Sequence, residues 1–327
     1  DVSHMGQAWL KGPDHETTSR ALEALVPADI ISLSPGQQRY SQLLNDEGGI
    51  IDDLMVSRTA IGEFEGWLYL VVNAGRKEVD FAHIRAHLPG GIDLVEKPDW
   101  ALIALQGPKS EAVLERLLPG TAALSFMSGN AFKCTTDGDT FDVYASRSGY
   151  SGEDGYEISV ANDNAAALWS ALMAEPEVDA VGLGARDSLR LEAGLCLYGH
   201  DIDETTSPIE AQLAWSIGKR RRQEGGFPGA ERIQRELAEG PARKRVGILP
   251  EGRAPVREGS EIVARDGTPL GTVTSGGFGP TVQRPVAMGY VSAEAAAPGT
   301  EVDLVVRGKP LAGRVEKMPF ITPGYKR

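Results

Sequence analysis

Apolar residues along the first two thirds of the chain follow both strand and helix patterns. Short apolar runs closed by glycine, "LYLVVNAG" at 68–75 and "ALIALQG" at 101–107, predict buried strands. Apolar residues at helical spacing in "SEAVLERLL" at 110–118 and "NAAALWSALMA" at 164–174 predict amphipathic helices. This mixture indicates an α+β region over residues 1–240.

Beyond residue 240 the pattern changes to short strands with turn pairs between them. The strand-like segments are residues 261–273, 286–291 and 301–318. Asp266–Gly267 and Gly308 mark tight turns, as does Asp137–Gly138 in the first region. This spacing predicts a small all-β domain over residues 241–327. The glycine-rich stretch 225–233 is interpreted as a linker before it.

Two adjacent aspartates, Asp52 and Asp53, interrupt the apolar run "GGIIDDLMV". Because neighbouring side chains of a strand point to opposite faces, Asp53 is expected to share one face with Ile51 and Met55, and Asp52 to lie on the other. An ionised carboxylate in a buried strand needs a partner or a polar cavity. At least one of the two is therefore predicted to face a site. A strand end where backbone donors bind both carboxylates is the open alternative.

A third carboxylate, Glu192, falls in the last turn of a helix predicted in "GARDSLRLEAGL". It shares a helical face with Ala185 and Leu189, which predicts that it is buried. The helix dipole disfavours an anion at that end by a few tenths to about 1 kcal/mol. Either a ligand with two parallel N–H donors or an arginine, Arg186 or Arg190, is expected to compensate the charge.

Charge and composition narrow the function classes. The net charge is −13, which argues against general nucleic-acid binding, because a phosphate backbone would be repelled. Four consecutive cations, Lys219 to Arg222, form a local exception. They are either a solvated face or a site for an anionic ligand or acidic partner.

The sequence lacks the usual signs of a metal site, a disulfide framework or a membrane span. His83 and His87 lie four residues apart without an evident third ligand and are interpreted as ordinary helix surface, so no metal is predicted. Cys134 and Cys196 form no CxxC pair, which favours a reducing compartment. No apolar run approaches bilayer length, so a cytoplasmic location is predicted. The start at "DVSHM" suggests that an upstream segment is missing.

Taken together, these segments resemble the glycine cleavage T-protein family, the aminomethyltransferases. The matching stretches run in order from the first residue to nearly the last: "DVSHMGQ", "YSQLLNDEGGIIDDLMV", "YLVVNAG", "ALIALQGP", "SGYSGEDGYEISV", "GARDSLRLEAGLCLYGHDIDETTSPIEAQLAWSIGKRRR", "FPGAERI", "GTVTSGGFGP", "VAMGYV" and "KMPFITPGY". Family proteins carry further residues before "DVSHM", in agreement with the missing segment.

The resemblance implies a three-domain folate enzyme, with two intertwined subdomains in residues 1–240 and a barrel-like all-β domain in residues 241–327. The activity would transfer the methylene carbon of an aminomethyl group from lipoylated H-protein to tetrahydrofolate. The products would be 5,10-methylenetetrahydrofolate, ammonia and dihydrolipoyl H-protein. No nucleic acid, membrane or metal is expected to take part, and the location would be the cytoplasm, or the mitochondrial matrix in a eukaryote.

The resemblance also assigns roles to residues. Asp53 matches the catalytic aspartate and Asp52 its structural neighbour, while Glu192 matches the glutamate that binds the pterin edge. The other expected folate-binding residues are Met5, Tyr69, Val71, Asn73, Tyr150, Arg221 and Tyr325. Whether Asp53 acts as a base or through its charge stays open.

Two other functions compete with this one. A folate-dependent demethylase of the same superfamily would share the fold, and fold alone does not determine the substrate. A non-catalytic folate-binding protein of iron–sulfur maintenance would carry a "KGCYxGQ" signature, which does not occur here. The uninterrupted "GKRRR" and "DIDETTSPIEA" stretches favour the T-protein.

Overall fold

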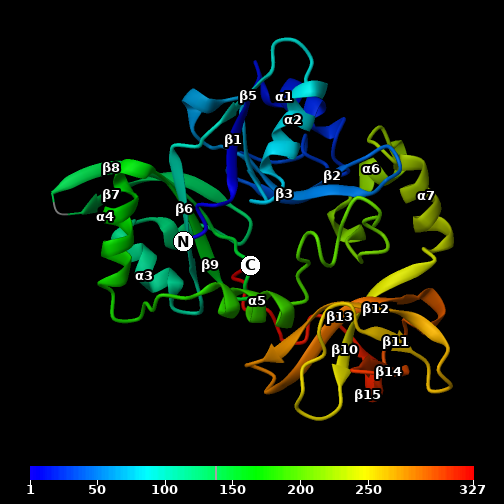
Figure 1. The fold of residues 1–327 in the computed structure, drawn as a ribbon. Helices are drawn as coiled ribbons and strands as arrows, with labels where there is room; N and C mark the ends of the chain where they lie inside the picture. The colour runs from blue at the N-terminus through cyan, green and yellow to red at the C-terminus, as the bar shows by residue number, and fades with distance from the viewer. Residues whose placement is uncertain (137) are drawn as a thin grey trace.

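The computed structural model describes residues 1–136 and 138–327, which form two open sheets and a closed barrel (Figure 1). The strand order is β2-β3-β4-β1-β5 in the first sheet and β6-β9-β8-β7 in the second. The barrel closes in the order β10-β13-β12-β11-β14-β15. The predicted α+β class with a C-terminal barrel is therefore confirmed.

The strands are β1 (Gly6–Lys11), β2 (Gln38–Leu44), β3 (Ile50–Arg58), β4 (Leu68–Val72), β5 (Asp93–Glu96), β6 (Trp100–Gln106), β7 (Gly129–Thr136), β8 (Asp139–Ser146), β9 (Gly155–Ala161), β10 (Arg243–Pro250), β11 (Glu261–Val263), β12 (Pro269–Gly279), β13 (Arg284–Ser292), β14 (Glu301–Val306) and β15 (Lys309–Glu316). The helices are α1 (His15–Glu23), α2 (Lys77–His87), α3 (Ser110–Leu117), α4 (Asn162–Met173), α5 (Leu183–Glu192), α6 (Lys219–Glu224) and α7 (Ala230–Glu239). The domain boundary predicted at residues 240–241 falls between α7 and β10, and it stays a prediction.

The two open sheets face each other, and helices cover their outer faces. Helices α1 and α2 pack on the first sheet, and α3 and α4 pack on the second. Between the sheets, Tyr69 and Val71 of β4 pack with Leu102 of β6 and Tyr144 of β8. The first two thirds of the chain thus form four layers, and the inner face of β4 belongs to the central one.

Strand β3 carries both aspartates and contains a β-bulge. Its pairing with β2 skips Ile51, which is the extra residue. Ile51 packs with Leu54 in the outer core, whereas Met55 lies with the residues between the sheets. The prediction that Ile51 shares a face with Asp53 is therefore wrong. From Asp52 onward, successive side chains of β3 alternate between the two faces of the sheet as predicted.

Helix α5 joins the sheets to the barrel. Its residue Leu191 packs with Val286 of β13, and the helix also contacts β12. Residues 225–233 are not the predicted linker, because Phe227 and Ile233 are buried in a core that they share with β2 and β3. The connection between the sheets and the barrel is consequently packed rather than extended.

Turn geometry in the barrel follows the predicted glycine positions. Arg307 and Gly308 have φ angles of 52° and 73°, the left-handed pair that a two-residue hairpin requires. At the β11–β12 hairpin, the Asp266 carboxylate accepts a hydrogen bond from the Thr268 N–H at 2.9 Å. The turn predicted at Asp137–Gly138 includes residue 137, which lies outside the described residues.

Candidate active site

The inner face of the first sheet brings Asp53 and the β4 residues together. Met55 is paired with Val71 in the β3–β4 register, and side chains two residues apart share a face. Asp53 therefore lies beside Asn73, next to Met55 and Val71. Tyr69 lies two residues before Val71 and extends the same face.

Two side-chain donors hold Asp53. The Tyr40 hydroxyl donates to Oδ2 at 2.9 Å, and the Asn73 amide nitrogen donates to Oδ1 at 2.6 Å. The residue as a whole is partly exposed, although its carboxyl group is largely surrounded by protein. This is the geometry expected of a reactive carboxylate that protein donors orient.

Asp52 is fully buried and held by one residue. Its Oδ2 accepts from the backbone N–H of Asn73 and its Oδ1 from the side-chain amide of Asn73, both at 2.9 Å. The prediction that protein donors hold Asp52 is confirmed. Asn73 therefore links the two carboxylates instead of pointing its amide hydrogens at a ligand.

The environment raises the pKa of Asp53 to about 7. Burial is the largest cause, and the negative charge of Asp52 adds to it. Hydrogen bonds from Tyr40 and Asn73 oppose the increase. Burial also raises the pKa of Asp52, against hydrogen bonds from Asp80 and Asn73. A carboxylate with a pKa near 7 both takes up and releases protons at physiological pH.

Tyr40 itself is part of an aromatic stack that opens to solvent. Its ring stacks on Trp215, with centroids 5.4 Å apart and planes inclined by 22°. Trp215 is 64% exposed, which is uncommon for an indole. An accessible aromatic surface therefore lies one residue away from the Asp53 carboxylate.

Glu192 is buried, as predicted, but neither predicted arginine compensates it. Its Oε1 accepts hydrogen bonds from the backbone N–H groups of Thr281 at 2.8 Å and Val282 at 2.9 Å. Arg190 instead pairs with Asp201. The helix turns its last residues inward, so Glu192 is buried, whereas Ala185, expected on the same buried face, is exposed.

The second oxygen of Glu192 is a buried acceptor without a donor. Oε2 receives no hydrogen bond from any described residue. Two residues whose backbone N–H groups bind Glu192, Val282 and Phe320, help to line a hollow of about 490 Å³ between the barrel and the C-terminal segment, but Glu192 itself does not line it. The two-donor ligand edge that the sequence predicted would therefore meet one free oxygen, because Oε1 is already bound by the barrel.

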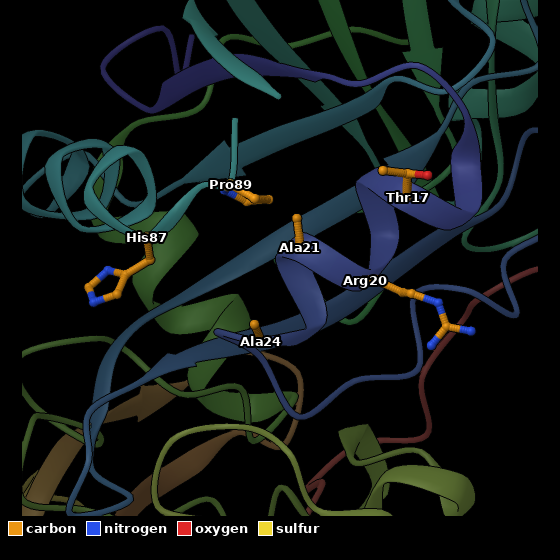
Figure 2. Close-up of a pocket in the computed structure, with 6 residues that line it drawn as sticks. All are labelled: Thr17, Arg20, Ala21, Ala24, His87 and Pro89. Carbon is orange, nitrogen blue, oxygen red and sulfur yellow. The ribbon is translucent and has the colours of Figure 1, made fainter. Parts of the chain in front are cut away.

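A second hollow, of about 500 Å³, lies between α1 and the C-terminal end of α2 (Figure 2). Its lining residues are Thr17, Arg20, Ala21, Ala24, His87 and Pro89. None of the predicted site residues lines it. Its side chains carry no arrangement that resembles a catalytic site.

The remaining predicted folate residues differ in their surroundings. Tyr69 is buried and its hydroxyl donates to Gln7 at 2.6 Å, while Met5 packs partly buried in the same core between the sheets. Tyr150 donates to the backbone oxygen of Cys196.

Two predicted folate residues make contacts within the protein itself. The ring of Tyr325 stacks on Phe126, with centroids 4.2 Å apart. The Arg221 guanidinium is buried and donates to backbone oxygens, among them that of Glu23. The structure does not bring Arg221 into hydrogen-bonding contact with Asp53 or Glu192, and its folate role stays a prediction.

The basic run, Lys219 to Arg222, mostly forms ion pairs and hydrogen bonds within the protein. Arg220 forms ion pairs with Glu23 at 2.7 Å and Asp29 at 3.0 Å, and Arg222 donates to the backbone of the preceding turn. Lys219 is exposed.

Within the described residues no group of His, Cys, Asp and Glu side chains is arranged to hold a metal ion. Likewise, no helix there has the length and hydrophobicity to span a bilayer.

Comparison with known protein families shows which family the chain belongs to. Residues 1–221 match the model of the GCVT N-terminal domain, and residues 243–321 match that of the glycine cleavage T-protein C-terminal barrel domain. The chain belongs to the glycine cleavage T-protein family.

Curated members of the family are similar over nearly the whole chain. The mitochondrial aminomethyltransferase of Mesembryanthemum crystallinum is 44% identical over 99% of this chain and 79% of the relative. The probable mitochondrial aminomethyltransferase of Schizosaccharomyces pombe is 42% identical over 99% of this chain and 82% of the relative. The crystal structure of glycine cleavage system aminomethyltransferase T from Bartonella henselae matches with a TM-score of 0.91 and 42% identity, covering all of this chain and 87% of that one.

Two residues of the site, Tyr40 and Asp80, escaped the sequence analysis. Tyr40 lies in a segment that alternates like a strand, so its contact with Asp53 required the β2–β3 register. Asp80 lies four residues before Ile84 in α2, a spacing that puts both on the buried face of this T-protein helix. From this spacing the sequence analysis could have predicted that Asp80 is buried.

Proposed function

We propose that the protein is the aminomethyltransferase of a glycine cleavage system. It would transfer the methylene carbon of the aminomethyl group on lipoylated H-protein to tetrahydrofolate. The products would be 5,10-methylenetetrahydrofolate, ammonia and dihydrolipoyl H-protein. The names of the curated relatives support the activity, and the surroundings of Asp53 support its chemistry.

The observation that carries the proposal is the state of the Asp53 carboxylate. It is partly exposed, oriented by Tyr40 and Asn73, and has a pKa of about 7. Release of ammonia and formation of a new carbon–nitrogen bond both require proton transfer near neutral pH. Asp53 holds or accepts such a proton at either Oδ atom. Its negative charge also stabilises positive charge that develops on the transferred group.

Tetrahydrofolate would supply the nitrogen atoms that receive the carbon. The orphan Oε2 of Glu192 fits the amine-rich edge of a pterin, because it is an ionisable acceptor that is buried without a donor. Val71 and Tyr69 lie on the sheet face that carries Asp53, where they are buried between the two sheets. These residues bind and orient, while Asp53 carries out the proton transfer.

H-protein is the proposed donor of the aminomethyl group. Lys219 is an exposed cation on a chain of net charge −13, and it is the member of the basic run best placed to attract an acidic partner. The plant and yeast relatives are named mitochondrial, so a eukaryotic protein of this sequence would act in the matrix. The cytoplasmic location stays a prediction.

Turnover tests the function directly. The protein should release ammonia from aminomethylated lipoyl H-protein only when tetrahydrofolate is present, and it should leave dimethylglycine unchanged. Demethylation of dimethylglycine without activity on H-protein would instead establish the related demethylase function. Folate binding without turnover of either substrate would establish a non-catalytic role.

A further inference from the structure

A fourth acidic side chain lies behind the active site. Asp80, in the first turn of α2, is fully buried. Among the described residues, no N–H group and no hydroxyl donates a hydrogen bond to either of its carboxyl oxygens. The position at a helix N-terminus favours an anion only modestly. Burial of a carboxylate without a donor disfavours the anion more strongly. The balance therefore favours a neutral Asp80.

The group within hydrogen-bonding reach of Asp80 is Asp52. Two carboxyl groups in contact avoid repulsion by sharing one proton. Asp52 already accepts from Asn73 at both oxygens, through the backbone N–H and the side-chain amide. Asp52 is thus arranged as the acceptor, and Asp80 as the group that carries the proton.

This arrangement determines which end of the Asn73 amide faces Asp53. One hydrogen of the Asn73 amide is directed to Asp52 Oδ1 and the other to Asp53 Oδ1. With Asp52 as an acceptor, the nitrogen end of the amide must face both aspartates. If Asp52 held the proton, it could donate to the amide oxygen, and the reversed amide would then present its oxygen to Asp53.

We propose that Asp80 is a positioning residue for the active site: it donates its carboxyl proton to Asp52 and so fixes the direction of the hydrogen bonds that run through Asn73 to Asp53. The inference rests on the proposed aminomethyl transfer only for its kinetic consequence. The location of the proton is a property of the protein alone.

The charges around Asp80 agree with a proton held there. Burial raises the pKa of Asp80 to about 10, and the charge of Asp52 and the hydrogen bond to it add to the increase. Arg76 acts in the opposite direction, and Asp53 adds a smaller increase. The Arg76 guanidinium is engaged elsewhere, with the Ile51 carbonyl at 3.0 Å and with Glu204.

Infrared spectroscopy locates the proton without any substrate. At pH 8.5 Asp53 is mostly ionised, and the protonated carboxyl of Asp80 should give a carbonyl band that is present in wild type and absent in Asp80→Asn. Asp163→Asn is the matched control, because Asp163 occupies the first turn of α4 but is exposed. This control should keep the band. A band that persists in Asp80→Asn would overturn the proposal.

Kinetics test the positioning role. Asp80→Leu introduces an apolar side chain of similar size that has no donor. The kcat should fall by about tenfold, the worth of one hydrogen bond, with little change in KM for tetrahydrofolate. Asp80→Asn supplies an N–H donor to Asp52 and should recover most of the lost kcat. If Asp80→Leu keeps the wild-type kcat, or Asp80→Asn is as impaired as Asp80→Leu, the positioning role is wrong.

The dependence of the rate on pH adds a readout that a purely structural role would not change. The relevant quantity is the position of the acid limb, the pH range over which the rate falls as the solution becomes more acidic. In Asp80→Leu, Asp52 loses its donor and keeps its own proton to higher pH. The repulsion that raises the pKa of Asp53 then weakens, while the reversed Asn73 amide no longer donates to Asp53 and acts in the opposite direction. The charge of Asp52 is the larger of these two causes, so the acid limb should move to lower pH. If Asp80→Leu does not fold, the infrared comparison still decides the proposal, since it needs Asp80→Asn alone. An inactive wild type would contradict the proposed function and leave the infrared result valid.

Discussion

The side-chain nitrogen of Asn73 lies 2.6 Å from Asp53 Oδ1 and 2.9 Å from Asp52 Oδ1. An amide nitrogen has two hydrogens, so both are used on the protein. Asn73→Ala should therefore lower kcat by about 10–100-fold, the worth of a hydrogen bond to a charged group, with little change in KM for tetrahydrofolate. Steady-state kinetics with varied folate measure both quantities. A raised KM with a normal kcat would instead indicate the direct folate contact that the family resemblance implies.

Asp53 and Asp52 should respond differently to loss of charge. Asp53→Asn removes the proton acceptor and should lower turnover by about 10²–10⁴. In wild type, kcat/KM should rise with pH and level off above about 7, since the ionised form of Asp53 is the acceptor. Asp52→Asn should act mainly on the free energy of unfolding, by about 0.5–3 kcal/mol.

Thermal unfolding supplies the control for both aspartate variants. The folded-state pKa of Asp53 lies above its unfolded value, so ionisation opposes folding as pH rises from about 4 to about 7. At pH 8, Asp53→Asn should therefore be at least as stable as wild type. Normal turnover in Asp53→Asn, together with a folded but inactive Asp52→Asn, would reverse the two assignments.

Tyr40→Phe should shift the pH profile upward. The Tyr40 hydroxyl donates to Asp53 at 2.9 Å and opposes the increase in its pKa. Without it the acid limb of the rate should move to higher pH. Tyr198→Phe is the matched control, because its hydroxyl donates to the Ile50 backbone oxygen at 3.1 Å. The two variants should differ in the position of the limb, and equal profiles would exclude the Tyr40 contact as a determinant.

Glu192→Gln should weaken tetrahydrofolate binding while preserving the fold. The amide oxygen of glutamine can keep the hydrogen bonds from Thr281 and Val282, and the amide nitrogen then replaces the free Oε2. A donor in that position repels the donor edge of a pterin, and affinity should fall by about 1.5–3 kcal/mol. Calorimetric titration measures the loss, and thermal unfolding verifies the fold. Wild-type affinity in the folded variant would remove Glu192 from the binding site.

Arg147→Met should be strongly destabilising. Arg147 is fully buried and donates to Asp154 at 2.9 Å and to Glu111 at 2.6 Å. Its loss leaves the buried Asp154 without its cation, which should cost about 3–5 kcal/mol in chemical denaturation. Arg116→Met is the control, since Arg116 forms ion pairs near the surface and its loss should cost about 0–1 kcal/mol. Similar losses in both would mean that burial does not determine the effect.

The sequence predicted the parts of the site that depend on periodicity. Alternation separated Asp52 from Asp53, and helical position predicted the burial of Glu192. Neither pattern could reveal the bulge at Ile51, because a bulge depends on the pairing with β2. Local sequence patterns report which face a residue occupies but not what the opposing segment contributes.

The partners of the acidic residues were hidden for the same reason. Glu192 is bound by backbone N–H groups about ninety residues away, which have no side-chain signature. Asp80 and Asp52 meet only after α2 packs against the first sheet. The family resemblance provided the roles of Asp53 and Glu192, but it did not provide these contacts.

The stack of Trp215 on Tyr40 gives the protein an optical reporter. The indole is largely open to solvent, and its neighbour is hydrogen-bonded to Asp53. Its fluorescence should therefore change when Asp53 gains a proton or when a molecule settles beside Tyr40. The chain has five tryptophans, so replacing the other four with phenylalanine isolates this emission. Events at the carboxylate then become visible in real time without an attached dye.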